Sequence, residues 1–352
     1  MPLLELVLLA VGHTRIASAR ARFASPLFED GYLARPARPE LPLLLYLPGF
    51  DGTLVSPWLQ LPALSTDYDI VGLAIPMEDR STFASLVDKV SDRLLTEPAE
   101  RRVVLMGESF GGILTLAVAL ALERAGRPLS AIALVNPATC YLESELAARA
   151  PAIASLPPLA YACGVLSLLP IFGDRHMLAQ ILQLVRGAKL PQVIDTPERE
   201  AYMGRVALSL PSRLRWMPRD TLRWRLREWL TCGARYIRAR EPELRSLRQP
   251  TCIVVGSADA TLPSVAEGER LARLLPDVAV AVVPGAGHAN TLGIRVNLAA
   301  LFRRRFGGPA QPGAVAPLAR LAVVPDGAED DADLGLEDRA HPPVSPRDYW
   351  RF

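Results

Sequence analysis

A single serine, set between a strand pattern and a helix pattern, constrains this chain more than any other feature. Residues 107–112 read GESFGG, at the end of one apolar run (102–107) and at the start of another of helical length (110–125). Glycines on both sides allow a sharp turn without a Cβ clash, and such a strand-to-helix turn exposes the serine hydroxyl. The helix N-terminus beneath it stabilises negative charge. We therefore predict that Ser109 is a nucleophile; the alternative is a glycine-rich turn with an incidental serine.

Short apolar runs alternate with helical patterns through most of the chain. Strands are predicted at 42–47, 69–75, 102–107, 131–136, 251–256 and 278–283. Helices are predicted at 81–97 (capped by Ser81), 110–125, 264–275 and 293–305. Strands that alternate with helices form a parallel sheet that is covered on both faces. The predicted fold class is therefore α/β, with a mostly parallel sheet, helices on both faces and a helical cap insertion.

The base and the acid that a serine nucleophile requires are found in loops after two later strands. His288 (in PGAGHANTL) follows the strand 278–283, and Asp259 (in GSADATLP) follows the strand 251–256. The other histidines lie in the termini or ahead of the acid: His13, His176 and His341. The order serine, acid, histidine is that of the α/β-hydrolase fold, so we predict this fold, with Asp259 orienting the base His288. A turn residue and a capped loop histidine are the alternatives for these two positions.

The oxyanion of an acyl-transfer reaction needs two backbone N–H donors. One is expected from Phe110, the residue after the nucleophile. The other is expected from Phe50 in the loop 48–53 (PGFDGT), where Gly49 allows the backbone to approach closely. For Asp51, in the same loop, turn stabilisation and a part in catalysis both stay open. We predict no cofactor and no metal.

Overall composition restricts the partners and the compartment. The formal charge at pH 7 is only +2, which gives no case for nucleic-acid binding. Four cysteines, without the spacing of a zinc site or a disulfide framework, are interpreted as buried, reduced thiols. They are Cys140, Cys163, Cys232 and Cys252. Apart from any targeting signal, this usage favours a soluble intracellular protein.

Residues 140–250 interrupt the alternation and predict a predominantly helical insertion between two strands. An insertion there lies above the carboxyl ends of the strands, where α/β sheets hold their sites, so we expect a cap over Ser109. Its stretch 151–172 is apolar but broken by prolines, which predicts short helices rather than a membrane span. Its stretch 213–240 contains nine arginines, two acids and three of the five tryptophans.

The arginine-rich stretch has two interpretations. Leu222, Leu226, Trp229 and Tyr236 fall near one face of a helix that starts near Pro218, with arginines on the other faces. A basic amphipathic helix with tryptophans suits a membrane or lipid-droplet surface rich in anionic lipid. The alternative is a lid helix that packs its apolar face on the sheet while solvent surrounds its arginines.

The two ends of the chain are expected to lie outside the core, which is predicted at 41–139 and 251–306. Within the N-terminal segment 1–40, residues 14–25 are rich in Ala, Ser and Arg and contain no acid, which is typical of an organelle transit peptide. The alternative there is a helix packed on the domain. Residues 307–352 are rich in Gly, Pro, Ala and acid and predict a disordered tail.

Seven stretches, in order, carry a resemblance that goes beyond the general fold. They are LPLLLYLPGFDGT (41–53), GLAIPMEDRSTFASLV (72–87), GESFGG (107–112), LVNPAT (134–139), MPRDTLRWRLREWL (217–230), GSADATLPSVAEGERLARLLP (256–276) and GHANTL, which contains His288. The chain resembles the phytyl ester synthase and diacylglycerol acyltransferase family of plastids over roughly residues 23–306.

This resemblance implies acyl transfer from an acyl thioester or a galactolipid to phytol or diacylglycerol, in the chloroplast, at plastoglobules or thylakoids. It implies Ser109, Asp259 and His288 as the triad. Family members continue into a glycerolipid-acyltransferase-like domain marked by HxxxxD, and no histidine here is followed by Asp at that spacing. The chain is therefore expected to correspond to the hydrolase-like domain only.

Together the motifs and the resemblance predict a serine-dependent enzyme that transfers or hydrolyses the acyl groups of lipid esters through an acyl-enzyme. Two alternatives stay open. One is a small-ester or thioester hydrolase without lipid preference. The other is a non-catalytic, ligand-binding relative of the same fold.

Overall fold

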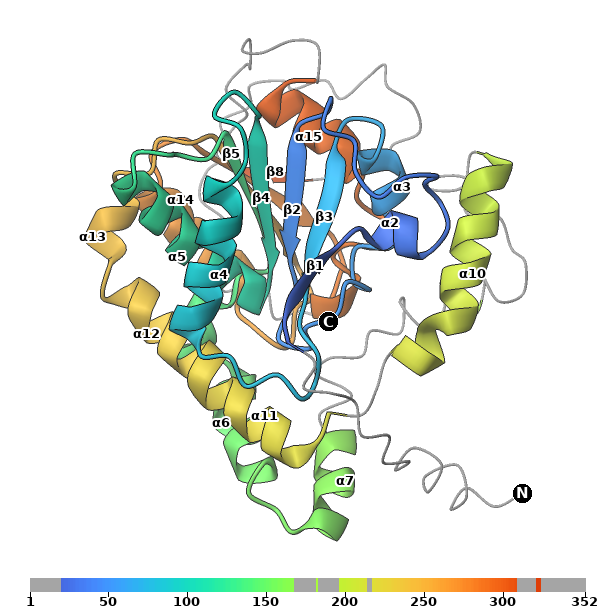
Figure 1. Ribbon diagram of the computed structural model, residues 1–352. Coiled ribbons are helices and arrows are strands. Elements are labelled where there is room, and N and C mark those ends of the chain that lie inside the picture. The colour runs from blue at the N-terminus through green and yellow to red at the C-terminus, as the bar shows by residue number, and fades with distance from the viewer. Residues whose placement is uncertain (1–19, 168–181, 183–195, 214–216, 309–320, 324–352) are drawn as a thin grey trace.

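Eight strands in the described part of the chain form one central sheet (Figure 1). The structure is a computed structural model that describes residues 20–167, 182, 196–213, 217–308 and 321–323. The strands are β1 (Arg22–Ala24), β2 (Leu43–Leu47), β3 (Asp69–Ala74), β4 (Val103–Glu108), β5 (Ala131–Val135), β6 (Thr251–Gly256), β7 (Val278–Val283) and β8 (Leu321–Val323). Their order across the sheet is β1-β3-β2-β4-β5-β6-β7-β8.

All neighbouring strands run parallel except β1, which pairs antiparallel with β3. The carboxyl ends of β4, β5, β6 and β7 therefore meet at one edge of the sheet, with these four strands side by side. The predicted α/β class with a mostly parallel sheet is confirmed.

Helices cover both faces of the sheet, and each face has its own core. Along β2, Leu43, Leu45 and Leu47 join one cluster and Leu44 and Tyr46 the other, because successive side chains of a strand point to opposite faces. The first cluster includes side chains of α4 (Phe83–Leu95), α5 (Phe110–Arg124) and α14 (Ser264–Leu274). The second includes side chains of α2 (Pro26–Glu29), α3 (Leu61–Leu64) and α15 (Leu298–Phe306).

The sheet extends beyond the expected core at both ends. β1 and α2 lie in the segment 1–40, where Leu27 is fully buried. Residues 321–323 pair with β7 inside the segment for which the composition predicts disorder. A strand at the edge of a sheet leaves N–H and C=O groups unpaired along one side. β1 pairs with β3 and β8 pairs with β7, so these groups of β3 and β7 are satisfied. The expected core boundaries are therefore too narrow. Half of the stretch with transit-peptide composition, residues 14–19, lies outside the described residues.

The described part of the insertion divides between two sides of the molecule (Figure 1). Its helices are η1 (Ala138–Glu143), α6 (Glu145–Ile153), α7 (Pro158–Leu166), α10 (Pro197–Arg213), α11 (Arg219–Arg225), η2 (Leu226–Thr231), α12 (Cys232–Arg238) and α13 (Glu241–Leu244). α10 lies beside α2: the rings of Tyr202 and Tyr32 are 5.3 Å apart, and Arg213 pairs with Asp30. α11, η2 and α12 pack on the other side, against α4 and α5. The described insertion is therefore not a single layer over Ser109.

Residues 219–238, here called the arginine-rich helix, run through α11, the π-helical turn η2 and α12 without a break. The face packed on the core comprises Thr221, Leu222, Arg225, Leu226, Trp229, Leu230, Gly233, Ala234 and Ile237. The expectation that the arginines occupy the other faces is wrong for Arg225, which is fully buried. Its position fits the three- and four-residue spacing of the buried face, and this spacing overrides its residue type.

α7 differs from the arginine-rich helix in having no charged residue (PLAYACGVL). Pro158, Ala160, Ala162, Cys163 and Leu166 are nonetheless exposed. Among the described residues, no helix is long and apolar enough to cross a membrane.

Two local details differ from expectation. The side chain of Thr82, rather than that of Ser81, caps α4 by accepting a hydrogen bond from the N–H of Ser85. Cys163 and Cys232 are exposed, so the interpretation of buried thiols is wrong for these two and holds for Cys140 and Cys252.

Candidate active site

Ser109 sits in a strained turn between β4 and α5. Its φ of 53° and ψ of −114° lie in a region that residues with a side chain rarely adopt. The surrounding backbone holds this conformation: the N–H of Ser109 donates to Val135 O (2.9 Å), and its carbonyl accepts from the N–H groups of Gly112 (3.0 Å) and Ala138 (2.9 Å). Strain that is held in this way is characteristic of functional positions.

The glycines of the GESFGG stretch are required by close packing around the turn. A Cβ on Gly107 would lie 2.1 Å from Gly111 O, and a Cβ on Gly111 would lie 2.0 Å from Leu47 O. Both distances are far below van der Waals contact. The glycines therefore let α5 pack directly against the ends of β2 and β4, with Ser109 at the junction.

Asp259 and His288 meet above the ends of β6 and β7. Asp259 lies in the loop after β6, and His288 begins the short helix η3 (His288–Asn290) after β7. The Nδ1 atom of His288 is 2.7 Å from Oδ2 of Asp259. The carboxylate is itself fixed, because its Oδ1 accepts from the N–H groups of Thr261 (2.8 Å) and Leu262 (3.0 Å) and its Oδ2 from the Ser264 hydroxyl. Contact of Nδ1 with a carboxylate favours the tautomer with the proton on Nδ1, so that Nε2 accepts a proton.

The pKa values of the pair shift in opposite directions. Burial lowers the pKa of His288, but the charge of Asp259 and the hydrogen bond to it outweigh burial, and the pKa lies above the ordinary 6.5. Burial raises the pKa of Asp259, but the charge of His288 and hydrogen bonds from His288, Ser264 and Leu262 N–H lower it below its usual value. Each group thus stabilises the charged form of the other, as a base and its orienting acid require.

Asn136 joins the loops that carry these residues, a role that the sequence analysis did not assign. It directly follows β5, is fully buried and has a φ of 40°. Its side chain donates to His288 O (3.1 Å) and Thr291 Oγ1 (2.7 Å) and accepts from the N–H of Gly256 (2.9 Å). Positive φ favours Asn among residues with side chains, so an Asn at the end of a buried strand is the signal in the sequence.

The nucleophile and the base lie at the same edge of the sheet, after β4 and β7. Among the described residues, no hydrogen bond joins Ser109 Oγ to His288. In a protein without substrate this contact is often long and shortens only in the complex. The geometry therefore shows an oriented acid–base pair and a strained serine at one edge of the sheet.

The two residues expected to supply oxyanion donors lie on either side of Ser109. Phe110 is the first residue of α5, so its N–H has no partner four residues earlier in that helix. The loop that carries Phe50 passes close to the nucleophile, since a Cβ on Gly49 would lie 3.7 Å from Ser109 Cβ. The carbonyl of Gly49 accepts from Gly52 N–H (3.0 Å), and the two polar groups of a trans peptide point in opposite directions. The N–H of Phe50 therefore points away from Gly52.

Asp51 stabilises the turn of this loop. Its carboxylate accepts hydrogen bonds from the N–H and the hydroxyl of Thr53, two residues further on. Burial raises the pKa of Asp51, while the hydrogen bonds from Thr53 and the charge of Arg225 act in the opposite direction. Of the two roles considered for Asp51, these contacts support the structural one.

Glu108, directly before the nucleophile, belongs to a second buried group that the sequence analysis missed. Its carboxylate accepts from Tyr46 Oη and from Ser56 Oγ, both at 2.6 Å. Burial raises the pKa of Glu108, against the hydrogen bonds from Ser56 and Tyr46 and the charge of His288. Glu108 in turn raises the pKa of His288, so it adds to the field of Asp259.

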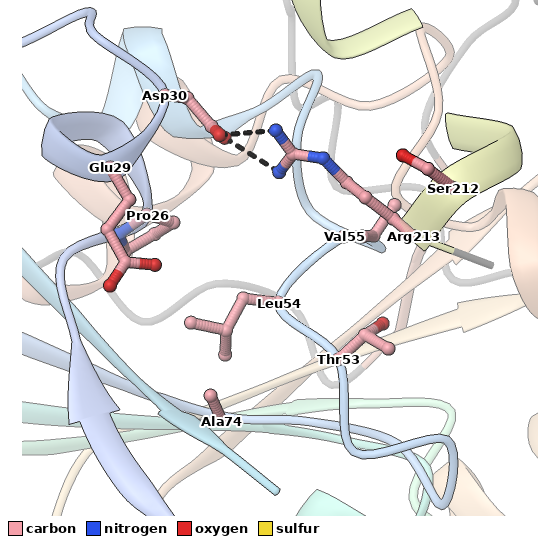
Figure 2. A pocket seen from close by; sticks show the side chains of 9 residues that line it. All are labelled: Pro26, Glu29, Asp30, Thr53, Leu54, Val55, Ala74, Ser212 and Arg213. Carbon is pink, nitrogen blue, oxygen red and sulfur yellow. Dashed lines mark hydrogen bonds and ion pairs between the residues drawn. The ribbon is translucent and has the colours of Figure 1, made fainter. Parts of the chain in front are cut away.

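A cavity of about 320 Å³ lies beside this site rather than over it. Its lining comprises Pro26, Glu29, Asp30, Thr53, Leu54, Val55, Ala74, Ser212 and Arg213, and so includes none of Ser109, Asp259 and His288. Figure 2 shows the ion pair of Asp30 and Arg213 at one wall, with Leu54 and Thr53 at another. The loop that carries Phe50 thus continues into the wall of this cavity.

Comparison with known proteins defines the family. A profile described as the alpha/beta hydrolase family matches residues 44–295, and the chain belongs to this family. It is 31% identical over 269 residues to phytyl ester synthase 1, chloroplastic, of Arabidopsis thaliana, an overlap of 75% of this chain and 37% of the relative. It is 30% identical over 281 residues to phytyl ester synthase 2, chloroplastic, of the same plant, an overlap of 74% of this chain and 37% of the relative.

The resemblance to phytyl ester synthases and the expected fold are both confirmed by these matches. The chain spans 37% of the length of each of these curated relatives. Among solved structures, MenH from S. aureus superposes with a TM-score of 0.50 at 19% identity, over 81% of this chain and 96% of that one. At this identity the likeness concerns the fold alone. Family and relatives support an enzyme of ester hydrolysis or acyl transfer.

Proposed function

We propose that the chain is a serine-dependent enzyme that forms an acyl-enzyme on Ser109. The observation that carries this proposal is the largely buried pair of Asp259 and His288, with Nδ1 and Oδ2 2.7 Å apart, at the same sheet edge as a serine held in a strained turn. A strained serine, a base and an orienting acid in this chain order are the parts of a nucleophilic triad.

In the proposed first step, Ser109 Oγ bonds to the acyl carbon while its proton passes to Nε2 of His288. The bond from the acyl carbon to the leaving oxygen or sulfur then breaks, and that atom takes the proton from His288. In the second step His288 removes a proton from the acceptor, whose oxygen bonds to the acyl carbon as Ser109 Oγ leaves and regains a proton. Water as acceptor gives hydrolysis, and an alcohol gives transfer.

The amides of Phe50 and Phe110 are the proposed donors to the oxyanion of both steps. Preformed N–H donors contribute much to such catalysis because their orientation costs nothing during the reaction. The start of α5 adds the positive end of a helix dipole beneath the same point.

Lipid esters are the substrates that we propose, with an acyl ester or thioester as donor and a long-chain alcohol such as phytol as acceptor. The similarity to two proteins named phytyl ester synthases supports this class. Their names also support a chloroplast location for this chain. A small-ester or thioester hydrolase is the second candidate, since nothing in the triad geometry distinguishes acyl-chain lengths.

A peripheral position at a lipid surface is a further part of this proposal. α7 supports it by exposing uncharged, largely apolar residues, with Leu166 52% exposed. Arg227 supports it too, as a cation for anionic headgroups: its Nε pairs with Glu228 and its guanidinium lies over the Trp224 ring, but 65% of its side chain is exposed. Arg225 cannot contribute to such a surface, because it is fully buried in the core.

The test combines turnover of p-nitrophenyl esters from acetyl to palmitoyl with product analysis in galactolipid and phytol. We expect long chains to be preferred and phytyl esters to form. Ser109→Ala should lower turnover about a millionfold while the protein stays folded. Activity of the variant above a few per cent would exclude Ser109 as nucleophile. Preference for acetyl esters would instead favour the small-ester candidate.

A further inference from the structure

One helix of the insertion contacts both residues whose amides are the proposed oxyanion donors. The ring of Trp229 stacks on the ring of Phe110, with centroids 4.9 Å apart and an interplanar angle of 16°. Arg225, one turn earlier, donates from Nη1 to the carbonyl of Phe50 at 2.7 Å. We infer that Arg225 and Trp229 form a clamp that positions the oxyanion donors, an inference that rests on the proposed function.

The clamp is continuous because its two members also contact each other. Cζ of Arg225 lies 4.3 Å from the ring centroid of Trp229, in cation–π contact. The indole N–H of Trp229 donates to Ser81 O at 2.8 Å, which fixes the ring in its plane. A chain of contacts therefore runs from Phe110 through Trp229 and Arg225 to Phe50.

Backbone carbonyls of two separate loops hold the guanidinium of Arg225 in place. Its Nη2 donates to Pro76 O (2.7 Å) and Ile75 O (3.2 Å), at the end of β3. A fully buried cation is costly unless other groups compensate it. Here three carbonyls and an aromatic face compensate the two Nη groups of Arg225, while its buried Nε–H has no hydrogen-bond partner among the described residues. Burial lowers the pKa of Arg225 to about 10, with Asp51 and Asp79 acting in the opposite direction, so the guanidinium stays charged at neutral pH.

The contact with Phe50 O completes the fixation of the oxyanion loop. On one side of Phe50, the peptide is held through Gly49 O by the N–H of Gly52 (3.0 Å). On the other side, the peptide is held through Phe50 O by Arg225. Residue 52 is a glycine with a φ of +75°, and a Cβ there would lie 2.3 Å from Ile75 O and 2.9 Å from Nη1 of Arg225, so a side chain at this position would disturb the contact. Both peptide planes around Phe50, and hence the direction of its N–H, are thereby set.

The π-helical turn η2 contains one member of the clamp and directly follows the other. η2 follows Arg225 directly and contains Trp229. A π-helical turn interrupts the regular spacing of a helix, and such turns are frequent at functional sites. The alternative role for Arg225 is simply to fasten the insertion to the core, and the experiment must separate the two.

Arg223 provides a matched control on the same helix. Its Nη2 donates to Ala154 O at 2.9 Å, so it ties the helix to α6 without touching the oxyanion loop. The variants are Arg225→Gln, Arg225→Lys and Arg223→Gln. The readouts are kcat and KM on a short ester, affinity for an aromatic boronic acid that mimics the tetrahedral intermediate, thermal unfolding, and hydrogen exchange of the amides of residues 49–53.

We expect Arg225→Gln to lower kcat about 10- to 100-fold with little change in KM, because loosening a donor costs less than the roughly 100- to 1,000-fold of removing one. Boronate affinity should fall by a similar factor and exchange at residues 49–53 should accelerate. Arg225→Lys should recover part of kcat, and Arg223→Gln should change none of these. If both glutamine variants lose only thermal stability, with kcat and exchange in the loop unchanged, Arg225 merely fastens the insertion.

Failure of the proposed function has a different signature. A wild-type protein that turns over no ester and binds no boronate would exclude the serine mechanism. Hydrogen exchange then decides about the clamp by itself: faster exchange at residues 49–53 in Arg225→Gln but not in Arg223→Gln supports positioning of the loop. Equal exchange in both variants and the wild type overturns it.

Discussion

α7 and the arginine-rich helix belong to the same insertion, yet the composition of each predicts an environment different from the one it has. α7 has no charged residue and exposes Leu166 and most of its neighbours. The arginine-rich helix carries six arginines in residues 219–238 and packs one face on α4 and α5, with Arg225 and Trp229 fully buried. Spacing along a helix, more than residue type, therefore selects the buried face.

The two helices also differ in whether they contact residues of the candidate active site. The arginine-rich helix contacts Phe50 and Phe110, whereas the described contacts of α7 go to other parts of the insertion, such as the hydrogen bond from Tyr161 Oη to Met217 O. Changes in the arginine-rich helix should therefore alter chemistry as well as stability. Changes in α7 should alter association with lipid and little else.

Among the changes that test this comparison, replacement of the acid Asp259 should have the largest effect, and it should act through the base His288 rather than through the oxyanion loop. Asp259→Asn should lower the rate about ten-thousandfold, as the equivalent change does in a serine protease. His288 works as a base only when neutral, so kcat/KM rises with pH through its pKa, which Asp259 holds above 6.5. Loss of that charge should move this acid limb to lower pH.

Arg225→Gln should leave the acid limb where it is, because Arg225 is not among the groups that shift the pKa of His288. Rate measurements on both variants from about pH 5 to about pH 9, a range that includes the one in which histidine titrates, test the distinction. A limb that moves in Arg225→Gln would mean that the helix acts through the base.

Substitutions in the two helices should also differ in their effect on the free energy of unfolding. Trp229→Ala removes a fully buried ring that stacks on Phe110, so the free energy of unfolding should fall by about 3–5 kcal/mol. Leu166→Ala, at an exposed position of α7, should change it by no more than about 0.5 kcal/mol. Urea denaturation followed by circular dichroism gives both values. Similar losses in the two variants would show that α7 is packed in solution.

Liposome flotation tests the exposed residues of both helices. Leu166→Glu places a charge on the exposed apolar surface of α7 and should weaken binding several-fold. Arg227→Gln should weaken binding to anionic vesicles about fivefold, the equivalent of roughly 1 kcal/mol per cation near such a surface. Neither change should affect turnover of a short soluble ester. Wild-type protein that ignores anionic vesicles at low salt would remove the lipid-surface proposal.

The smallest effect concerns thiol accessibility, where both helices should behave alike. Cys163 on α7 and Cys232 in the arginine-rich helix are exposed, while Cys140 and Cys252 are buried. Burial raises the pKa of Cys252 to about 12, which further suppresses its thiolate. Titration with a disulfide reagent should find two fast thiols in the native protein and four in denaturant. Slow reaction at Cys163 alone would mean that α7 is covered in solution.

Much of this fold could be predicted from short stretches of the sequence. The strands and helices around Ser109 could be predicted because each lies in one continuous apolar run, and parallel strands must bring their loops to one edge. The pair of Asp259 and His288 followed from chain order and from the scarcity of histidines. Edge strands β1 and β8, three residues each, are too short to give a periodic pattern.

What could not be predicted depends on contacts between distant parts of the chain. Arg225 and Phe50 are 175 positions apart, and Glu108 and Tyr46 are 62 apart. Asn136 links loops that lie 120 and 155 positions away. A buried arginine is rare, so residue type placed Arg225 in solvent. The signal in the sequence for its burial is its position on the apolar stripe of the helix.

The central claim is that Ser109, activated by His288, is the nucleophile. The most direct test is to treat the native protein with a fluorophosphonate, which reacts with activated serines, and to locate the adduct by peptide mass spectrometry. The account predicts one adduct, on the peptide that contains Ser109, its absence in Ser109→Ala, and much slower labelling in Asp259→Asn. Labelling of a different serine, or undiminished labelling in Ser109→Ala, would contradict it.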